Sequence, residues 1–377
     1  MKLTDKINEL NGKEMSYYQR WTELMEVVTS GAFTDEDIPE VKMIEKEVKK
    51  MKPKTAKPKT ASFSEGAYLK SLFQGSTPKA SVLSNVRLVS NGFIVTLYGI
   101  QGDYAYAFTS DYQINAPEFD VLVKITDFKS VVGKGISSID LRDDILYIND
   151  MPVPCELNDD KFPEVETIYG ETVVVEVSPF QGVIHSVSKN ESRRFACGVL
   201  LDNDVIVTTD GKRLTKKECK TGIKDKILSL MFVKAFPKSG DVVMTTNGDK
   251  VQIKYNNITI ITNFMEATFP PYASVMPNLE GYIEYDIPKI DSKKFKSFLK
   301  DEVAIVFDKD TLIAGDYKEV IPELKGNEIK FAVNYRYYED ALKFSSKLSI
   351  KHATSTIVFT GDNHYEIIMP MSIPEEV

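Results

Sequence analysis

Four side chains of this sequence could form a hydrolytic site, in which a histidine would activate a serine hydroxyl. They are His185, Ser186, Ser188 and Asp210. Three aspartates could instead bind a metal ion through their carboxylates. They are Asp202, Asp204 and Asp210. Both sets contain the residue types that such chemistry needs, so their spacing in the chain has to decide.

That spacing argues against catalysis. The three histidines, His185, His352 and His364, stand in unrelated sequence contexts. No GxSxG, HExxH or P-loop spacing occurs. The stretch 202–204 is typical of a turn that connects two strands. We therefore predict that the protein is not an enzyme and that it needs no metal and no cofactor.

The last residues suggest a different chemistry, the binding of apolar groups. The chain closes with "HYEIIMPMSIPEEV", which contains an apolar run of Ile367, Ile368, Met369, Pro370 and Met371. A buried final strand would account for the two isoleucines. The methionines and the proline fit that interpretation less well, because proline interrupts strand pairing and flexible methionine suits a surface that accepts several ligands.

Basic side chains recur on or beside the predicted helices of an otherwise acidic chain. A solvated helix face explains any single one of them equally well, but the clusters appear in each part of the chain. We predict that together they contact a polyanion. The set is Lys70, Lys79, Lys189, Arg193, Arg194, Lys234, Lys238, Lys293, Lys294, Lys296 and Lys300.

Length and composition limit the kinds of protein that could position these residues. The 377 residues are enough for about two or three domains. Hydrophobic residues make up 42% and charged residues 27% of the chain, which allows sizeable cores. A net charge of −8 excludes a protein that coats nucleic acid through bulk positive charge. Three unrelated cysteines, with no signal peptide and no membrane-spanning apolar run, favour a cytoplasmic location.

The chain divides into an extension and a repeat. Residues 1–48 have helical apolar spacing, and "KKMKPKTAKPKTAS" at 49–62 is typical of an extended linker. From Phe63 onwards, strand patterns dominate, for example at 85–100, 138–150 and 249–264. Helical patterns interrupt them at 64–74, 178–190, 225–236, 291–300 and 335–346.

An internal repeat sets the boundaries of the predicted units. "DKFPEVETI" at 160–168 recurs as "ATFPPYASVMP" at 267–277, and another proline-containing apolar strand closes the chain. Each instance follows a pair of strands, at intervals of about one domain length. We predict three similar α+β units at 63–168, 171–280 and 282–377, preceded by the extension and linker at 1–62.

The predicted middle unit contains the most specific sequence motifs. It reads "HSVSKNESRRFACGVLLDNDVIVTTDGKRL" and then "FMEATFPPYASVMP". This order of helix, strand, "TDG-x-RL" turn and proline-tyrosine segment resembles the bacterial DNA polymerase III beta subunit, the sliding clamp. "FAVNYRYYEDALK" and "IIMPMSI" resemble motifs of that family's last domain. The resemblance covers about 63–377. The extension, Pro271, Ser274 and a loosely matching first unit depart from the family, as in a diverged, phage-type member.

The resemblance implies the DNA clamp fold, in which three similar domains of antiparallel sheets turn their helices inward. Two chains would then join head to tail in a ring, and the basic residues would line its hole and hold duplex DNA without reading bases. The strand edge in "ILYINDMPVPCEL" and the helix at 291–300 would meet at the contact between chains, although aromatic residues on such a helix are equally typical of a core. The expected interface residues are Val153, Phe295, Phe298 and Leu299.

The resemblance also implies a pocket between the second and third units. It would bind short linear peptides of a polymerase, a clamp loader and repair proteins. Its residues would be Ala196, Thr209, Gly211, Lys212, Arg213, Leu214, Pro270, Val275, Ile367, Met369, Pro370 and Met371. The function implied is that of a replication processivity factor. The alternative is a clamp-fold scaffold or single-strand-binding protein that forms no closed ring.

Overall fold

The computed structural model describes residues 82–373, except 92–93, 110–117, 133–135, 137–138, 143–144, 160–161 and 300–302. The chain divides into two compact units, Met1–Ala61 and Ser62–Val377, and every described residue belongs to the second. Several predictions lie outside the described residues. They are the extension and linker at 1–62, the helix at 64–74, and Lys70, Lys79 and Lys300.

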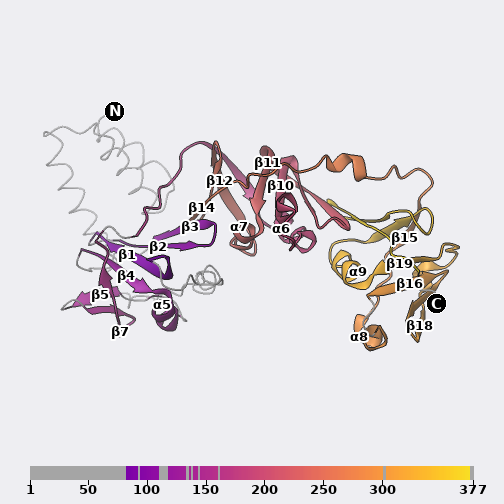
Figure 1. Cartoon of the computed structure of the whole chain (residues 1–377), viewed down its shortest axis with the longest axis horizontal. Helices are drawn as coiled ribbons and strands as arrows, with labels where there is room; N and C mark the ends of the chain where they lie inside the picture. Colours follow the sequence, from indigo (N-terminus) through magenta and orange to yellow (C-terminus); the bar gives the residue numbers. More distant parts are fainter. Residues whose placement is uncertain are drawn as a thin grey trace, which may run out of the picture. The chain divides into compact units, whose positions relative to one another are not determined.

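Four antiparallel sheets make up the described part of the chain (Figure 1). The largest contains, in spatial order, β8 (Glu156–Leu157), β4 (Phe119–Lys124), β1 (Asn85–Ser90), β2 (Val95–Gln101), β3 (Tyr104–Thr109), β14 (Ile258–Asn263), β13 (Lys250–Tyr255), β12 (Asp241–Asn247) and β9 (Glu171–Glu176). The second contains β10 (Gly198–Thr209), β11 (Arg213–Ser229), β22 (His364–Ile368), β21 (Ile357–Gly361), β20 (Lys347–Ile350) and β15 (Ile283–Asp286).

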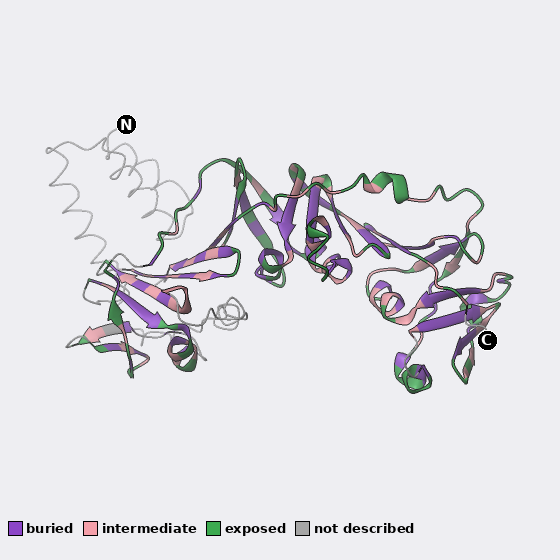
Figure 2. Ribbon diagram, in the orientation of Figure 1, coloured by how far each residue is buried: buried purple, intermediate pink, exposed green. Residues whose placement is uncertain are grey.

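Two smaller sheets complete this architecture. One contains β18 (Tyr317–Val320), β17 (Thr311–Ala314), β16 (Ala304–Asp308) and β19 (Phe331–Asn334). The other contains β5 (Ile139–Arg142), β6 (Ile145–Ile148) and β7 (Met151–Val153). Side chains of β1, β2 and β3 alternate strictly between buried and partly exposed, because successive residues of a strand point to opposite faces (Figure 2). The strands predicted at 85–100, 138–150 and 249–264 are confirmed.

The helices are short and lie between strands. They are α5 (Ile125–Val131), α6 (Ser178–Gln181), α7 (Leu230–Lys234), α8 (Ser292–Phe295) and α9 (Tyr335–Ala341), with 3-10 turns that include η3 (Ile184–Ser186), η4 (Arg194–Cys197) and η6 (Lys296–Phe298). The side chains of Ser229, Asp291 and Asn334 cap three of them by accepting a backbone N–H. No described helix is long and apolar enough to cross a membrane.

Three details of the predicted secondary structure were wrong. Residues 225–229 belong to β11, because Ile227 and Leu228 are buried as strand residues before the Ser229 cap starts α7. Helix α5 has no counterpart among the predicted helices. The supposed turn at 202–204 is an irregularity within β10, where Asn203 has a φ of 56° and the register with β11 shifts.

Two pairs of strands join the predicted units. We call the pairing of β3 with β14 the first seam and the pairing of β11 with β22 the second seam. The first brings Tyr106 opposite Ile260 in the nine-stranded sheet. The second brings Leu214 opposite Ile367 in the six-stranded sheet. Each sheet therefore continues from one predicted unit into the next.

The cores follow these seams differently. One hydrophobic core contains both Tyr106 of β3 and Ile260 of β14, so it continues across the first seam. Across the second seam, Ile368 belongs to a core that lies within the third predicted unit, whereas Leu214 and Ile367 belong to a separate, smaller cluster. The second seam is thus bordered by distinct cores on its two faces.

Candidate functional site

The turn between β10 and β11 is built by its own side chains. Asp210 Oδ1 accepts hydrogen bonds from the backbone N–H groups of Lys212, at 2.9 Å, and Arg213, at 3.1 Å. Thr209 Oγ1 accepts from Gly211 N, at 3.0 Å, and donates to the Arg213 carbonyl, at 2.7 Å. Gly211 has a φ of 87°, a conformation that favours glycine. The "TDGKR" sequence therefore specifies a rigid turn.

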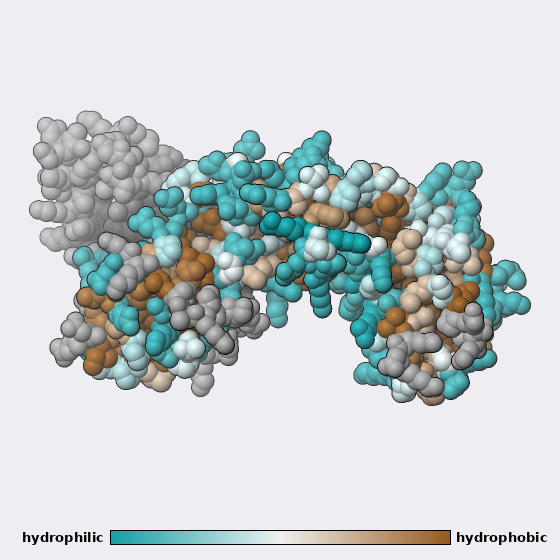
Figure 3. Space-filling model, viewed as in Figure 1, coloured by the Kyte–Doolittle hydropathy of each residue, from teal (hydrophilic) through white to brown (hydrophobic). Residues whose placement is uncertain are grey.

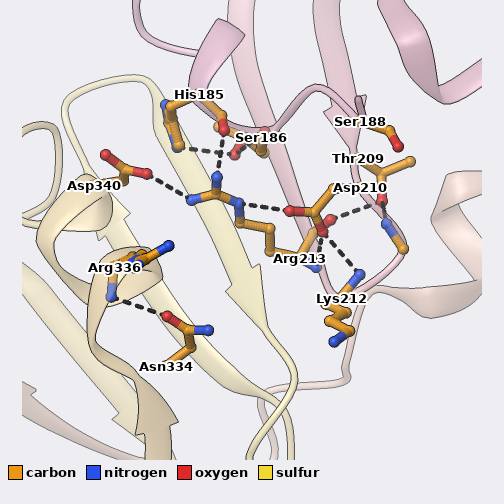
Figure 4. Close-up of polar contacts among 12 residues, drawn as sticks. His185, Ser186, Ser188, Thr209, Asp210, Lys212, Arg213, Asn334, Arg336 and Asp340 are labelled. Carbon is orange, nitrogen blue, oxygen red and sulfur yellow. Dashed lines mark hydrogen bonds and ion pairs between the residues drawn. The ribbon is translucent and has the colours of Figure 1, made fainter. Parts of the chain in front are cut away.

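Arg213 leaves this turn and crosses the second seam as a buried cation (Figure 4). Its Nε lies 3.1 Å from Asp210 Oδ2, and its Nη1 lies 2.9 Å from Asp340 Oδ2 on α9. Its Nη2 donates to the carbonyl of His185. The guanidinium also lies over the ring of Tyr337, 4.2 Å from the ring centroid. These contacts make Arg213 a link between β11 and α9, which lie in the second and third predicted units.

The second seam has two chemically different faces, because side chains alternate along paired strands. Leu214 and Ile367 face each other on what we call the outer face, within the small apolar cluster. Thr215 and Glu366, the next pair, point to the inner face. The α9 residue Asp340 and the η3 residue His185 approach that inner face.

The outer face gathers many of the predicted pocket residues. Leu214 and Ile367 pack there with partly buried Phe195, Phe269 and Tyr272. Lys212 accepts a hydrogen bond at 2.9 Å from Met369 N, which places the exposed Met369 beside the turn. Ala196 is buried in η4, and Pro270 and Val275 are exposed on the segment that contains Phe269 and Tyr272.

Met371 lies apart from this group. Its backbone N–H donates to the Ala332 carbonyl of β19, at 2.8 Å. Its side chain packs with Val306, Ile313 and Ala332 of the four-stranded sheet. Pro370 separates it from Met369 and is half-buried. The two methionines of the predicted pocket therefore lie apart, Met369 beside the turn and Met371 against the four-stranded sheet.

The inner face carries a buried carboxylate between two imidazoles. Glu366 Oε2 lies 3.0 Å from His185 Nε2 and 3.4 Å from His364 Nε2, and the Glu366 side chain is fully buried. Burial alone would raise the pKa of Glu366, but hydrogen bonds from His185 and His364 and the nearby Arg213 outweigh it and lower that pKa. Glu366 is therefore held as an anion inside the seam.

The histidines were wrongly interpreted as unrelated, since His185 and His364 meet at Glu366 although 181 residues separate His185 from Glu366.

The other side chains of the suggested hydrolytic set have different partners. Asp210 binds Arg213, and the Ser188 hydroxyl accepts from Asn190 N. Asp202 of the suggested metal cluster accepts from the Tyr272 hydroxyl, at 2.9 Å. Among the described residues, no group of His, Cys, Asp and Glu side chains could hold a metal ion.

Comparisons with known proteins concern the sequence and the fold of the chain. No protein-family model matches the chain. The beta sliding clamp of Chlamydia pneumoniae is 25% identical over 227 residues, which are 51% of this chain and 61% of that protein. The structure of the DNA polymerase III beta subunit of Thermotoga maritima matches 84% of this chain and 98% of its own, with a TM-score of 0.69 and 18% identity. The chain is therefore similar to beta sliding clamps, distantly in sequence and over most of its length in fold.

A second structural match concerns a clamp with a bound peptide. The Helicobacter pylori beta clamp bound to a DNA ligase peptide matches 82% of this chain and 96% of its own, with a TM-score of 0.66 and 17% identity. The clamp fold, with antiparallel sheets and few helices, is the predicted fold class. The sliding clamps that the chain resembles are non-enzymatic, and the sequence likewise predicted a protein that is not an enzyme.

Of the eight described basic residues of the predicted set, three lie in α-helices, two in 3-10 turns and three in loops. Lys189 and Arg193 lie in the segment between η3 and η4, Arg194 starts η4, and Lys238 follows α7. Lys234 ends α7, and Lys293 lies on α8. Two members of the set are paired with carboxylates. Lys294 Nζ lies 2.8 Å from Glu319, and Lys296 Nζ lies 3.0 Å from Glu339.

Three of the four predicted interface residues are buried in the chain's own cores. They are Val153, Phe295 and Leu299. Phe298 on η6 keeps 42% of its surface exposed, so it alone of that set presents an apolar surface. Sequence reasoning missed exposed apolar residues on edge strands, including Met151 of β7 and Val320 of β18. Figure 3 shows one face of the molecule, on which apolar and hydrophilic residues are interspersed.

Sequence reasoning also missed the inner face of the second seam. Asp340 was seen only as part of a family motif, and Glu366 was not singled out. One signal was present in "HYEII", where alternation puts Glu366 on the same face as the buried Ile368. A charged residue at a core position needs a partner, which points to a histidine or an arginine from another strand or helix.

Proposed function

We propose that this protein is a DNA sliding clamp, in which two chains form a ring around duplex DNA and tether a polymerase to it. Three similar domains of each chain, at 63–168, 171–280 and 282–377, would form half of the ring. The clamp fold and the distant match to a beta sliding clamp support this function. Work on DNA inside a cell implies a cytoplasmic protein. A tethered polymerase would act at a high effective concentration without any chemistry from the ring.

The observation that carries the proposal is the repeated way in which strands join at the seams. The first seam pairs β3 with β14. Strand β3 is the third of the four strands that precede α5, and β14 is the last of the three strands that follow α7. The corresponding third strand before α9 is β18, and the corresponding last strand after α5 is β7. Both lie at the edges of their sheets in the described chain.

These two edges suit a third joint of the same kind, formed between two chains. Unpaired edge strands are normally protected or used, and both edges here carry exposed apolar side chains. Val320 of β18 is 65% exposed, Met151 of β7 is 44% exposed, and Ile145 of the adjacent β6 is 45% exposed. A head-to-tail pairing of β18 with β7 of a second chain, repeated twice, would close the ring. Phe298 would contribute beside β18.

The exposed basic residues would hold the DNA. Lys189, Arg193 and Lys234 are exposed cations near the ends of η3, η4 and α7, where inward helices would meet the phosphates. Phosphate attraction is independent of sequence, so it allows the ring to move along the duplex. Lys294 and Lys296 would contribute less, since each already has a carboxylate partner.

The outer face of the second seam would bind the partner peptides. It combines the exposed Met369 with the partly buried aromatic side chains of Phe195 and Tyr272, above the buried Leu214 and Ile367. Leucine and aromatic side chains of a linear peptide would insert there. A relative of the same fold, from Helicobacter pylori, was solved with a DNA ligase peptide. We propose the polymerase, the clamp loader and a ligase as the partners.

Retention on circular DNA tests the ring. The protein is loaded onto nicked circular duplex at low salt, isolated by gel filtration, and then challenged by linearisation of the DNA. A closed ring should remain on the circle and slide off after linearisation, and light scattering should give the mass of two chains. Release of the protein from circular and linear DNA at the same salt concentration would instead support the alternative function, a scaffold that binds DNA electrostatically.

A charge-reversed variant locates the DNA contact. Lys189→Glu combined with Arg193→Glu should reduce retention on the circle several-fold, and more steeply as salt rises. Lys250→Glu combined with Lys254→Glu, on the exposed side of β13, is the matched control. Equal loss in both variants would mean that net charge, rather than these positions, governs binding.

A further inference from the structure

The two faces of the second seam are mechanically linked, because alternate residues of the same two strands form them. Leu214 lies between Arg213 and Thr215, and Ile367 lies between Glu366 and Ile368. Leu214 and Ile367 can keep their spacing only if the neighbouring pairs on the inner face keep theirs. A shift of one residue in the pairing would move the side chains of one face to the other.

Directional contacts across the seam lie on the inner face. Arg213 Nη1 meets Asp340 Oδ2 at 2.9 Å, and His185 Nε2 meets Glu366 Oε2 at 3.0 Å. Lys217 Nζ lies 5.7 Å from the centroid of the Phe344 ring. On the outer face, Leu214 and Ile367 contribute apolar packing, which does not fix orientation, and Met369 N donates to Lys212 at the end of the strand.

Neither inner carboxylate can reach a ligand on the outer face. Glu366 is fully buried on the inner side of β22. Asp340 lies on α9 and is held by Arg213 and by Lys343, whose Nζ is 2.7 Å away. Any effect of these two residues on a ligand of the outer face must therefore pass through the strands.

We propose that Asp340 and Glu366 are positioning residues for the outer face, and that they set its peptide affinity by fixing the spacing of Leu214 and Ile367 across the seam. This inference rests on the proposed function for its ligand. Loss of Asp340 removes the carboxylate that joins Arg213 to α9, although Arg213 keeps Asp210, and loss of Glu366 removes the anion between the two imidazoles. In both cases the strands lose a contact that fixes their orientation.

The test uses the full-length protein and a fluorescein-labelled peptide of the DNA ligase that the Helicobacter clamp binds. Asp340→Asn should weaken peptide binding by roughly threefold to thirtyfold, the range of such indirect couplings. Asp340→Glu keeps the charge and should restore most of the affinity. Asp286→Asn is the matched control, because Asp286 pairs with Lys347 at 2.9 Å in the same unit but away from the seam.

Amide hydrogen exchange gives a readout that needs no ligand. Asp340→Asn and Glu366→Gln should each speed exchange in 212–216 and 364–369, with no change in β3 or β14. Unchanged exchange in both variants, or an affinity of Asp340→Asn equal to that of Asp286→Asn, would overturn the inference. Absence of binding by the unmodified protein would count against the peptide pocket itself, while the exchange data would still decide whether these residues position the strands.

Discussion

At the first seam, Tyr106 and Phe108 of β3 face Ile260 and Ile258 of β14, and all four are buried in one core. At the second seam, Thr215 faces Glu366 and Lys217 faces His364, with Arg213 beside them. The two seams share the antiparallel pairing of strands but differ in the chemistry of their inner faces. The two seams thus have the same backbone pairing, and their different side chains give them different properties.

The difference has an energetic meaning. Apolar burial at the first seam is stabilising whatever the exact orientation, at about 25 cal/mol for each Å² removed from water. A buried ionic layer stabilises only when every partner is in place, since desolvation opposes it. The second seam is therefore the more specific joint and the one more sensitive to single changes of charge. Four predictions test this contrast, beginning with the largest expected effect.

Removal of the Tyr106 ring should break the first seam most strongly. Tyr106 is fully buried and lies opposite Gly99 of β2, where a Cβ atom would come within 2.0 Å of the Tyr106 hydroxyl oxygen. Tyr106→Ala should lower the free energy of unfolding by about 3–5 kcal/mol, because it leaves a large cavity. Urea denaturation at pH 7 measures this loss. A loss below that of the conservative variant Tyr106→Phe would contradict an apolar first seam.

Neutralisation of the buried cation should affect the second seam to a smaller degree. Arg213→Met keeps the aliphatic stem but leaves Asp340 and the His185 carbonyl without the guanidinium. We expect a loss of about 2–3 kcal/mol, below the range for a fully buried pair because Asp340 is partly exposed. In the same urea experiment, Arg87→Met is the control, because Arg87 pairs with Asp120 at 2.6 Å within the first unit. An equal loss of free energy of unfolding in both variants would show that the ion pairs of Arg213 at the second seam stabilise the protein no more than an ion pair elsewhere.

The proposed joint between chains should behave like the first seam. Val320→Asp puts a charge on the exposed edge strand β18, and we expect about a tenfold weaker dimer, which corresponds to roughly 1.4 kcal/mol. Sedimentation equilibrium measures the dissociation constant. Val174→Asp on β9, also an exposed edge position, is the control. A dimer unaffected by Val320→Asp would exclude β18 from the contact.

The smallest expected effects are those of pH, because the second seam should lose stability in acid and the first seam in alkali. Hydrogen bonds from His185 and His364 and the Arg213 charge lower the pKa of Glu366, while Lys343 and Arg213 lower that of Asp340, against the opposing effect of burial. Their stabilisation is complete above the unfolded pKa values of 4.5 and 3.8, and it is lost as pH falls through the lower folded values.

The first seam should fail at the other end of the pH range. Burial raises the pKa of Tyr104 to about 12, so its contribution is present below the unfolded value of 10.0 and is lost as pH rises toward 12. Amide exchange, corrected for intrinsic rates, should show the second seam opening first in acid and the first seam opening first in alkali. The reverse order would contradict the assignment of charges to the seams.

Local patterns were sufficient to predict much of the fold. Alternation in "NVRLVS" and "VTLYGI" specifies β1 and β2, because a half-buried strand needs that period. The Thr209–Arg213 turn could also be anticipated, since Asp210 and Gly211 fix its geometry locally. Motif order led to the clamp family, because the "TDGKRL" and "IIMPM" segments carry that information without any contact being known.

Contacts between distant residues could not be predicted from such patterns. No local signal pairs His185 with Glu366, because their proximity depends on the register of β11 with β22. Phe295 was expected at an interface, but it packs in the core of the third unit against Tyr317 and Tyr335, since an apolar helix face does not reveal what covers it. Val320 was missed because exposure of an edge strand depends on the strand order of the sheet.

The second seam also has a consequence for the protein while the ribosome is still making it. Strand β11 emerges long before its neighbour β22, and Arg213 precedes its partner Asp340 by 127 residues. Since chains are made from the N-terminus at about 5–20 residues per second, the Arg213–Leu214 edge stays open for about 8–30 seconds during synthesis. An open edge with apolar side chains can pair wrongly with another nascent chain. The lysines that follow on β11, including Lys216 and Lys217, place positive charges along that edge and would keep two nascent copies apart until the last strand arrives.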